Sequence, residues 1–310
     1  MYASTLNIVR RVVGDNVWLC RPETRSEEVL AGLSSRALDY EVIETEESVG
    51  RAMLGEIEAV ARSRQGDIVI ILLGGRGAQA LHRLLGELAR TSEIDPLLSR
   101  LHVFTQDAIA PLRMESELSF VRDFERLLGD AFFEKVKSFT SIETDTRDLE
   151  GQLTAYVEKL ESMGGVDIFF LGHGPEPGGA SHLAYIRAGS GATATDLAGV
   201  IPISAGILEH HITKFKAGGS AVSEADETEC RRATHILTLG PAVILGARRI
   251  VQSIVDARTA PAKRETFRRV LETVIADNPA QRALQLDQNP GLWVRLHPNM
   301  RSLILPDVLA

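Results

Sequence analysis

The sequence predicts an α/β protein built on one open, mainly parallel sheet with helices on both faces. Two observations lead to this fold class. Apolar runs of strand length alternate with amphipathic helical segments from Tyr40 onward. The central runs, such as "DIVIILL" at 67–73, are continuously aliphatic, as expected for strands covered on both faces.

Composition limits the classes of function. The 310 residues are 44% hydrophobic and 25% charged, and the formal net charge is −8. A nucleic-acid partner is therefore not implied, and an anionic membrane surface would repel the chain. No apolar stretch reaches the ~20 residues of a membrane span, and the N-terminal run is too short for a signal peptide. The two cysteines form neither a disulfide framework nor a metal-ligand spacing, which favours a reducing, cytoplasmic setting.

The first half of the chain contains the clearest alternation. Residues 1–39 are interpreted as an N-terminal extension, with a short strand in "NVWLC" and helical spacing in "EEVLAGLSSRAL", and residues 40–310 as a single domain. Strands are expected at 40–44, 67–73, 101–107 and 166–172. Helices are expected at 46–64, 78–90, 117–128 and 148–162, the first because Val49, Met53, Ile57 and Val60 form one apolar stripe.

The second half continues the pattern. Strands are expected at 200–204, 235–240, 249–255 and 301–306, and helices near 205–213, 241–248 and 261–275. The segment 215–229, "FKAGGSAVSEADETE", is the most loop-like. It is either a surface loop without a role or a segment that covers a site.

Three strand ends carry unusual residues, and ligands of open parallel sheets bind beyond the carboxyl ends of the strands. The first is "GGRG" at 74–77. Its backbone amides and the N-terminus of the helix that follows can bind an anion. Arg76 can bind a phosphate in a bidentate way. The other interpretation is a tight strand-to-helix turn with an exposed arginine. The spacing matches neither a dinucleotide fingerprint nor a P-loop.

The other two strand ends carry candidate acid and base groups. Asp107 is either a cap or turn residue or a site residue. Glu176 and His182 lie on a glycine-rich loop, and a carboxylate with an imidazole suits general acid/base chemistry near neutral pH. His173 fits packing or solvent exposure equally well. His210 and His211 point about 100° apart on a helix, so we interpret them as helix surface.

Six segments resemble the family of glucosamine-6-phosphate deaminase and its relative 6-phosphogluconolactonase, from about residue 40 to the C-terminus. They are "ILLGGRGAQALHRLL", "LHVFTQDAIAPL", "SELSF", "GGVDIFFLGHGPEPGGASHLAY", "THILTLGPAVILGARRIV" and "PGLWVRLHPN". The last two are more similar to the deaminase branch. The resemblance implies a Rossmann-like fold of the sugar-phosphate isomerase type, a phosphorylated sugar as partner and no cofactor or metal; it leaves a homo-oligomer open.

The resemblance also assigns roles. Asp107 would move the proton between C1 and C2 during aldose–ketose isomerisation, and His182 would assist ring opening, after which ammonia leaves C2. In lactonases the histidine instead promotes attack of water on the lactone. With Glu176 as the third catalytic candidate, the expected substrate-binding residues are Gly74, Gly75, Arg76, Gly77, Gly172, Gly174, His235 and Lys263.

Several positions depart from the family pattern. Glu176 replaces the motif aspartate, an insertion precedes His182, and Arg187 stands where deaminases have the acid that pairs with the histidine. The phosphate arginine and lysine fall on His235 and Thr259, with Lys263 one helical turn later, and Ala108 replaces the acid after Asp107. A sugar-phosphate isomerase or deaminase is the first hypothesis. A lactone hydrolase and a non-catalytic sugar-phosphate-binding member are the alternatives.

Overall fold

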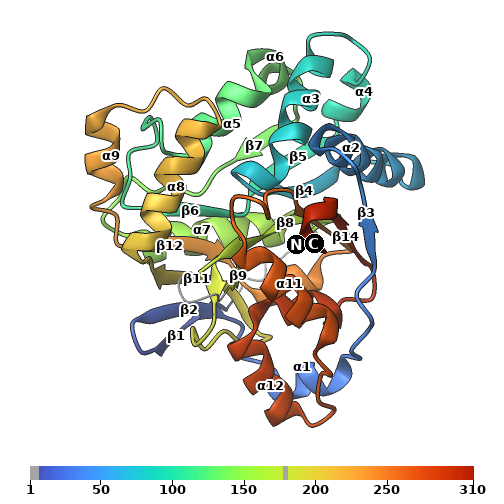
Figure 1. Cartoon of the computed structure of the whole chain (residues 1–310), viewed down its shortest axis with the longest axis vertical. Helices are drawn as coiled ribbons and strands as arrows, with labels where there is room; N and C mark the ends of the chain where they lie inside the picture. The colour runs from blue at the N-terminus through green and yellow to red at the C-terminus, as the bar shows by residue number, and fades with distance from the viewer. Residues whose placement is uncertain (1–6, 177–180) are drawn as a thin grey trace.

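The computed structural model of the chain describes residues 7–176 and 181–310. Its centre is a nine-stranded, mainly parallel sheet flanked by helices (Figure 1), which confirms the predicted fold class. Its path runs β3-β14-β13-β8-β4-β5-β7, and β9 and β10 extend antiparallel from β8. These strands are β3 (Tyr40–Val42), β4 (Ile68–Leu72), β5 (Leu101–Thr105), β7 (Ser138–Thr140), β8 (Ile168–Pro175), β9 (Ser181–Leu183), β10 (Ile186–Arg187), β13 (Arg249–Ile254) and β14 (Met300–Ile304).

The order of the parallel strands contains a switch point. From β4 the chain proceeds to β5 and β7 on one side, and later places β8, β13 and β14 on the other side. The connections after β4 and β8 therefore diverge and leave a crevice at the carboxyl ends of these two strands, where open α/β sheets bind ligands.

A second, five-stranded antiparallel sheet was not indicated by the sequence. Its order is β1-β2-β11-β12-β6. The strands are β1 (Val9–Val13), β2 (Asn16–Cys20), β6 (Asp107–Ala110), β11 (Asp196–Pro202) and β12 (His235–Leu239). The hairpin β1–β2 comes from the segment interpreted as an N-terminal extension. It pairs with β11, and Trp18 is fully buried there.

A single residue joins β5 of the large sheet to β6 of the small sheet along the chain. β5 ends at Thr105 and β6 begins at Asp107, so only Gln106 separates them. The Gln106 N–H donates to the Leu72 carbonyl at the end of β4, at 2.9 Å, and its carbonyl accepts from Leu239 N at the end of β12, at 3.1 Å. The backbone of Gln106 thus joins the large sheet to the small one.

The helices follow the expected order with additions. α2 has the predicted apolar stripe, since Val49, Met53 and Ile57 are buried, and the Thr45 side chain caps its start. Helices α2 and α3 pack together, as do α1 and α12 (Figure 1). The α-helices are α1 (Ser26–Gly32), α2 (Glu46–Ser63), α3 (Gln79–Ala89), α4 (Asp95–Leu98), α5 (Phe120–Leu128), α6 (Asp130–Lys135), α7 (Leu149–Ser162), α8 (Ala205–Ala217), α9 (Glu224–Cys230), α10 (Pro241–Gly246), α11 (Ala262–Glu272) and α12 (Pro279–Gln288). Short 3-10 helices are η1 (Arg76–Ala78), η3 (Pro290–Leu296) and η4 (Pro306–Val308).

The prediction of a continuous loop over 215–229 is wrong. Helix α8 continues to Ala217, and residues 224–230 form α9. A capping box explains this second helix, because the Ser223 side chain accepts from the Asp226 N–H while the Asp226 side chain accepts from Ser223 N. Within residues 7–176 and 181–310, none of the helices combines the length and apolarity that crossing a membrane requires.

Candidate active site

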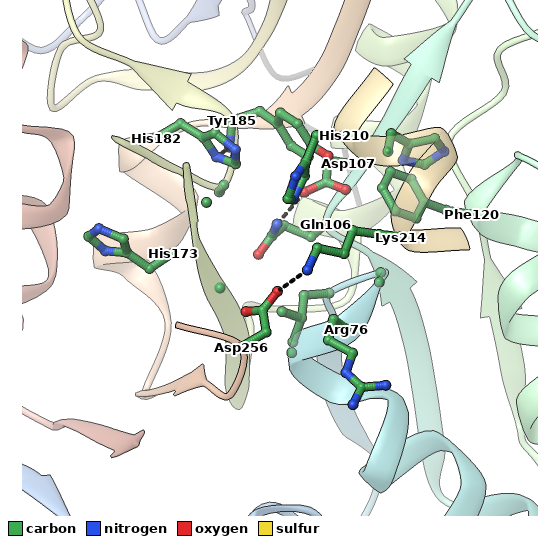
Figure 2. A pocket seen from close by; sticks show the side chains of 18 of the residues that line it. Arg76, Gln106, Asp107, Phe120, His173, His182, Tyr185, His210, Lys214 and Asp256 are labelled. Carbon is green, nitrogen blue, oxygen red and sulfur yellow. Dashed lines mark hydrogen bonds and ion pairs between the residues drawn. The ribbon is translucent and has the colours of Figure 1, made fainter. Parts of the chain in front are cut away.

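A cavity of about 100 Å³ lies at the switch point between β4 and β8 (Figure 2). Its wall is formed by the ends of four parallel strands, the hairpin β9–β10 and helices α8 and α11. The lining residues are Leu73, Gly74, Gly75, Arg76, Gly77, Gln106, Asp107, Phe120, Gly172, His173, Gly174, His182, Ala184, Tyr185, His210, His211, Lys214, Phe215, Ser253, Asp256 and Lys263. The three strand ends singled out in the sequence therefore converge on one cavity.

Asp107 is the buried acid of this cavity. It is the first residue of β6, where no helix begins, so it caps no helix. The residue is 3% exposed, and its carboxylate accepts a hydrogen bond from the Gln106 side-chain amide. Burial raises the pKa of Asp107 to about 7, although the hydrogen bond from Gln106 opposes this shift. A carboxylate with a pKa near neutrality can both accept and return a proton.

His182 lies on β9 and contacts the end of β8. A β-carbon on Gly174 would come within 2.0 Å of the His182 Nε2 atom, so only glycine allows the imidazole to lie this close. The Nδ1 atom accepts a hydrogen bond from the Tyr185 N–H at 3.0 Å. Because Nδ1 is the acceptor, the neutral ring carries its proton on Nε2. Burial, the largest cause, holds the pKa of His182 well below its usual range, with His173 and Lys263 adding to the effect.

A second part of the cavity wall carries two lysines that share one aspartate. Asp256 pairs with Lys263 from α11, and the Lys214 ammonium from α8 lies 3.3 Å from the Asp256 carboxylate. Burial by itself would raise the pKa of Asp256, but the two lysines outweigh it and the pKa is lowered. Two cations against one anion leave this wall with a net positive charge. An anionic group can bind here by replacing Asp256 as the partner of one lysine.

The glycine loop after β4 completes this wall. Gly75 has a φ of 72°, which favours glycine, and it precedes η1 and the start of α3. Arg76, however, pairs with Glu46 at 2.6 Å, and its guanidinium points away from the cavity (Figure 2). It lies towards an adjoining groove of about 590 Å³, which shares Arg76, Lys214 and Asp256 with the cavity. The tight turn of the alternative interpretation is present, whereas Arg76 is partly buried and ion-paired rather than freely exposed.

The structure brings together most of the predicted site residues. The predicted residues that line the cavity are Gly74, Gly75, Arg76, Gly77, Asp107, Gly172, Gly174, His182 and Lys263. Glu176 and His235 are not among its lining residues.

Two geometric reasons account for these exceptions. β8 continues to Pro175, so Glu176 lies at the tip of the β8–β9 hairpin, beyond the level of His182. Burial raises the pKa of Glu176 to about 7, and Arg187 opposes the shift. His235 begins β12, which runs antiparallel to β6, so His235 faces Ala110 while Thr238 faces Asp107. Three residues of a strand separate His235 from the level of the cavity by ~10 Å.

The interpretation of His210 and His211 as helix surface is wrong. His210 lines the cavity, and His211 is buried, with its Nε2 atom 2.7 Å from the Leu118 carbonyl. His173 is a packing residue, since it is buried and its Nε2 atom is hydrogen-bonded to the Thr266 hydroxyl.

Five polar lining residues were not found from the sequence: Gln106, Tyr185, Lys214, Ser253 and Asp256. A signal existed for Lys214, because it lies four residues after His210 and therefore on the same side of α8. A signal also existed for Asp256, two residues beyond β13. In the described residues, no group of three or more His, Cys, Asp or Glu side chains is arranged to hold a metal ion.

Known proteins resemble this chain detectably in structure but not in sequence. No family model and no curated protein matches the sequence. A monomeric glucosamine-6-phosphate deaminase is similar in structure, with a TM-score of 0.61 and 19% identity, over 87% of this chain and 98% of that chain. The 6-phosphogluconolactonase of Trypanosoma brucei has a TM-score of 0.59 and 18% identity, over 89% of this chain and 100% of that chain. That of Thermotoga maritima has a TM-score of 0.58 and 16% identity, over 86% and 99%.

These similarities span almost the whole length of each enzyme. At identities below 20% they establish the fold, and they agree with the resemblance of the six sequence segments. The chain therefore has the fold shared by glucosamine-6-phosphate deaminase and 6-phosphogluconolactonase, two kinds of enzyme of sugar-phosphate metabolism.

Proposed function

We propose that this protein is an aldose–ketose isomerase of a phosphorylated hexose, with release of ammonia when the hexose carries an amine at C2. The observation that supports it most is Asp107, a buried carboxylate in the cavity whose pKa is raised to about 7. Isomerisation needs one group that removes a proton from C2 and returns it to C1, and such a group works best with a pKa near neutrality.

The substrate would lie between the two walls. Its phosphate would bind the net positive wall formed by Lys214 and Lys263, near the amides of the glycine loop. Its C1 and C2 would then face Asp107 and His182, and the adjoining groove provides space beside the phosphate. No cofactor takes part in this scheme.

The chemistry then follows in three steps. The sugar ring opens to the aldehyde as the proton of the C1 hydroxyl passes through water to the ring oxygen, to which His182 donates a hydrogen bond from Nε2–H while keeping its proton. Asp107 takes the C2 proton, and the electron pair forms a C1–C2 double bond, with negative charge developing on O1 that the His182 N–H stabilises. Asp107 returns the proton to C1, and the C2 hydroxyl or amine gives a proton to O1, so that C1 becomes an alcohol and C2 a carbonyl or an imine. With a C2 amine the product is an imine, and water hydrolyses it to the ketose and ammonia.

Lactone hydrolysis is the second candidate, because the lactonases are about as similar in structure as the deaminase. That reaction uses a histidine that accepts a proton from water. His182 is less suited to it, since its Nδ1 already accepts from Tyr185 N and its Nε2 carries the proton. The hydrogen bond from Tyr185 N to His182 Nδ1 therefore favours isomerisation over lactone hydrolysis.

One experiment separates the candidates. The protein is incubated with glucosamine 6-phosphate or glucose 6-phosphate in D₂O, and the C2 proton signal is followed by NMR. Loss of this signal, abolished by Asp107→Asn, supports isomerisation. Hydrolysis of 6-phosphogluconolactone that needs His182 but not Asp107 supports the lactonase. If neither reaction occurs but sugar phosphates raise the melting temperature, the protein is a binding member without catalysis; a ligand at 100 times its Kd adds about 2.7 kcal/mol.

A further inference from the structure

The hairpin turn between β9 and β10 has an unusual backbone. Leu183 pairs with Ile186, so Ala184 and Tyr185 form a two-residue turn. Their φ angles are 49° and 57°, and they are the only non-glycine residues with positive φ in the part of the chain that the structure describes. Turns of this kind normally contain Asn or Gly, because a side chain at positive φ is strained. Such strain persists where the surrounding structure maintains it, and it is concentrated at functional sites.

His182 is held from three directions, two of them provided by the turn and one by β8. The turn places the Tyr185 N–H 3.0 Å from His182 Nδ1, and it stacks the Tyr185 ring on the imidazole with centroids 4.3 Å apart and planes 11° apart. Gly174 contacts the imidazole at Nε2 and Cε1. The turn is itself anchored, since the Thr238 hydroxyl of β12 donates to the Ala184 carbonyl. Figure 2 shows Tyr185 next to His182 on the wall of the cavity.

This arrangement differs from a histidine oriented by a carboxylate. A carboxylate accepts the Nδ1–H and leaves Nε2 free to act as a base. In this chain, Arg187 stands where the resemblance expects the acid that pairs with the histidine. The Nδ1 atom of His182 instead accepts a hydrogen bond from the backbone N–H of Tyr185. A donor at Nδ1 requires the opposite tautomer, with the proton on Nε2. Positive charge on the ring is also disfavoured, because Nδ1 would then carry a proton facing the Tyr185 N–H.

We propose that Tyr185 is a positioning residue whose strained backbone locks His182 in the Nε2–H tautomer, so that this histidine acts only as a hydrogen-bond donor to the substrate. The proposal on tautomer rests on the geometry of the turn. Its consequence for turnover rests on the isomerase function proposed above.

The test is ¹⁵N NMR of protein labelled at histidine, with His182→Gln to identify the signals of His182. Wild type should show an unprotonated Nδ1 and a protonated Nε2, unchanged from pH 5 to pH 8. Tyr185→Phe keeps the ring, and Tyr185→Gly keeps the backbone conformation without the ring, so both should retain this tautomer. Tyr185→Val also lacks the aromatic ring but strongly disfavours positive φ. It should show a mixture of tautomers or a titration between pH 5 and pH 8.

Activity gives a second measurement. The turnover number of Tyr185→Val in isomerisation should fall at least ten-fold below that of Tyr185→Gly. A wild-type spectrum with Nδ1 protonated at pH 7 would overturn the proposal, and this holds even if Tyr185→Val does not fold. A folded Tyr185→Val protein with the wild-type spectrum would also overturn it. The spectra need no substrate, so a wild type with the expected tautomer but no isomerisation would refute the proposed function and leave this inference intact.

Discussion

The ionisable groups on the two walls of the cavity have different kinds of neighbours. At the anion wall (Lys214, Asp256 and Lys263), each charge has a partner of opposite sign. At the reaction wall (Asp107, His182 and Tyr185), the acid has an amide for a neighbour and the imidazole has a backbone N–H. Paired charges stay ionised and can exchange a partner for a ligand. Buried groups without a counter-charge have shifted pKa values and can exchange protons. Under the proposed function, this difference places binding at the anion wall and chemistry at the reaction wall.

The strongest test of this division is Asp107→Asn. The amide keeps the shape but cannot accept the C2 proton, so isotope exchange at C2 should fall by about 10²–10⁴-fold, while the melting-temperature shift caused by sugar phosphates should remain. Asp123→Asn is a matched control, because Asp123 is also buried but pairs with Arg126 outside the cavity. If Asp107→Asn lowers the rate of isotope exchange at C2 by less than five-fold, the carboxylate does not take part in the reaction.

The same substitution should stabilise the protein. The pKa of Asp107 is raised to about 7 from 3.8, so between these pH values the unfolded chain releases a proton that the folded protein keeps. The free energy of unfolding therefore falls as the pH rises through this window. Above about pH 7 the ionised side chain lowers the free energy of unfolding by as much as about 4 kcal/mol. Asp107→Asn should raise the melting temperature at pH 8, and the gain should disappear below about pH 4. Equal melting temperatures of Asp107→Asn and wild type at pH 8 would show that burial of the ionised carboxylate does not destabilise the protein.

A lysine at the anion wall should affect binding more than turnover. Lys214→Met removes one charged ligand of the phosphate, and KM should rise about 10- to 100-fold with little change in kcat, since a hydrogen bond to a charged group contributes about 1.5–3 kcal/mol. Steady-state kinetics across sugar phosphates measure this. If kcat falls while KM is unchanged, the two walls are not separate in function.

Arg76→Met should have the smallest effect. The guanidinium pairs with Glu46 and points away from the cavity, and its side chain is 37% exposed. KM should therefore change less than about three-fold, and loss of an exposed ion pair should cost less than about 1 kcal/mol. An increase in KM equal to that of Lys214→Met would show that Arg76 turns towards the phosphate when substrate binds.

Most strands of the parallel sheet were readable from the sequence, because a continuous aliphatic run such as Ile68–Leu72 has few alternatives to a buried strand. The short edge strand β7, Ser138–Thr140, has no such run and was missed. The small sheet was not readable. Its strands Asp196–Pro202 and His235–Leu239 are as apolar as those of the large sheet, and the choice of sheet depends on long-range pairing with Val9–Cys20. Apolar periodicity identifies strands but not their neighbours.

The candidate site was predictable to a similar extent. Glycines and polar residues that directly follow strands identified Asp107 and the loop at 74–77. Lys214 was missed because His210, one turn earlier on α8, was itself interpreted as helix surface, and helix surfaces are rich in lysine. Tyr185 was missed because its role depends on a backbone angle, which a tyrosine in a sequence does not signal.

The backbone of Gln106, which bonds to strand ends in both sheets, has a consequence for how activity can be tuned. Asp107 belongs to the small sheet, whereas His182 extends from a strand of the large one. The distance between acid and imidazole therefore depends on how the two sheets are held together, by the Gln106 backbone and by the hydrogen bond from the Thr238 hydroxyl to the Ala184 carbonyl. Substitutions in the N-terminal hairpin, remote from any bound sugar, would then alter the rate of proton transfer by shifting one sheet against the other, without changing a single residue that the substrate touches.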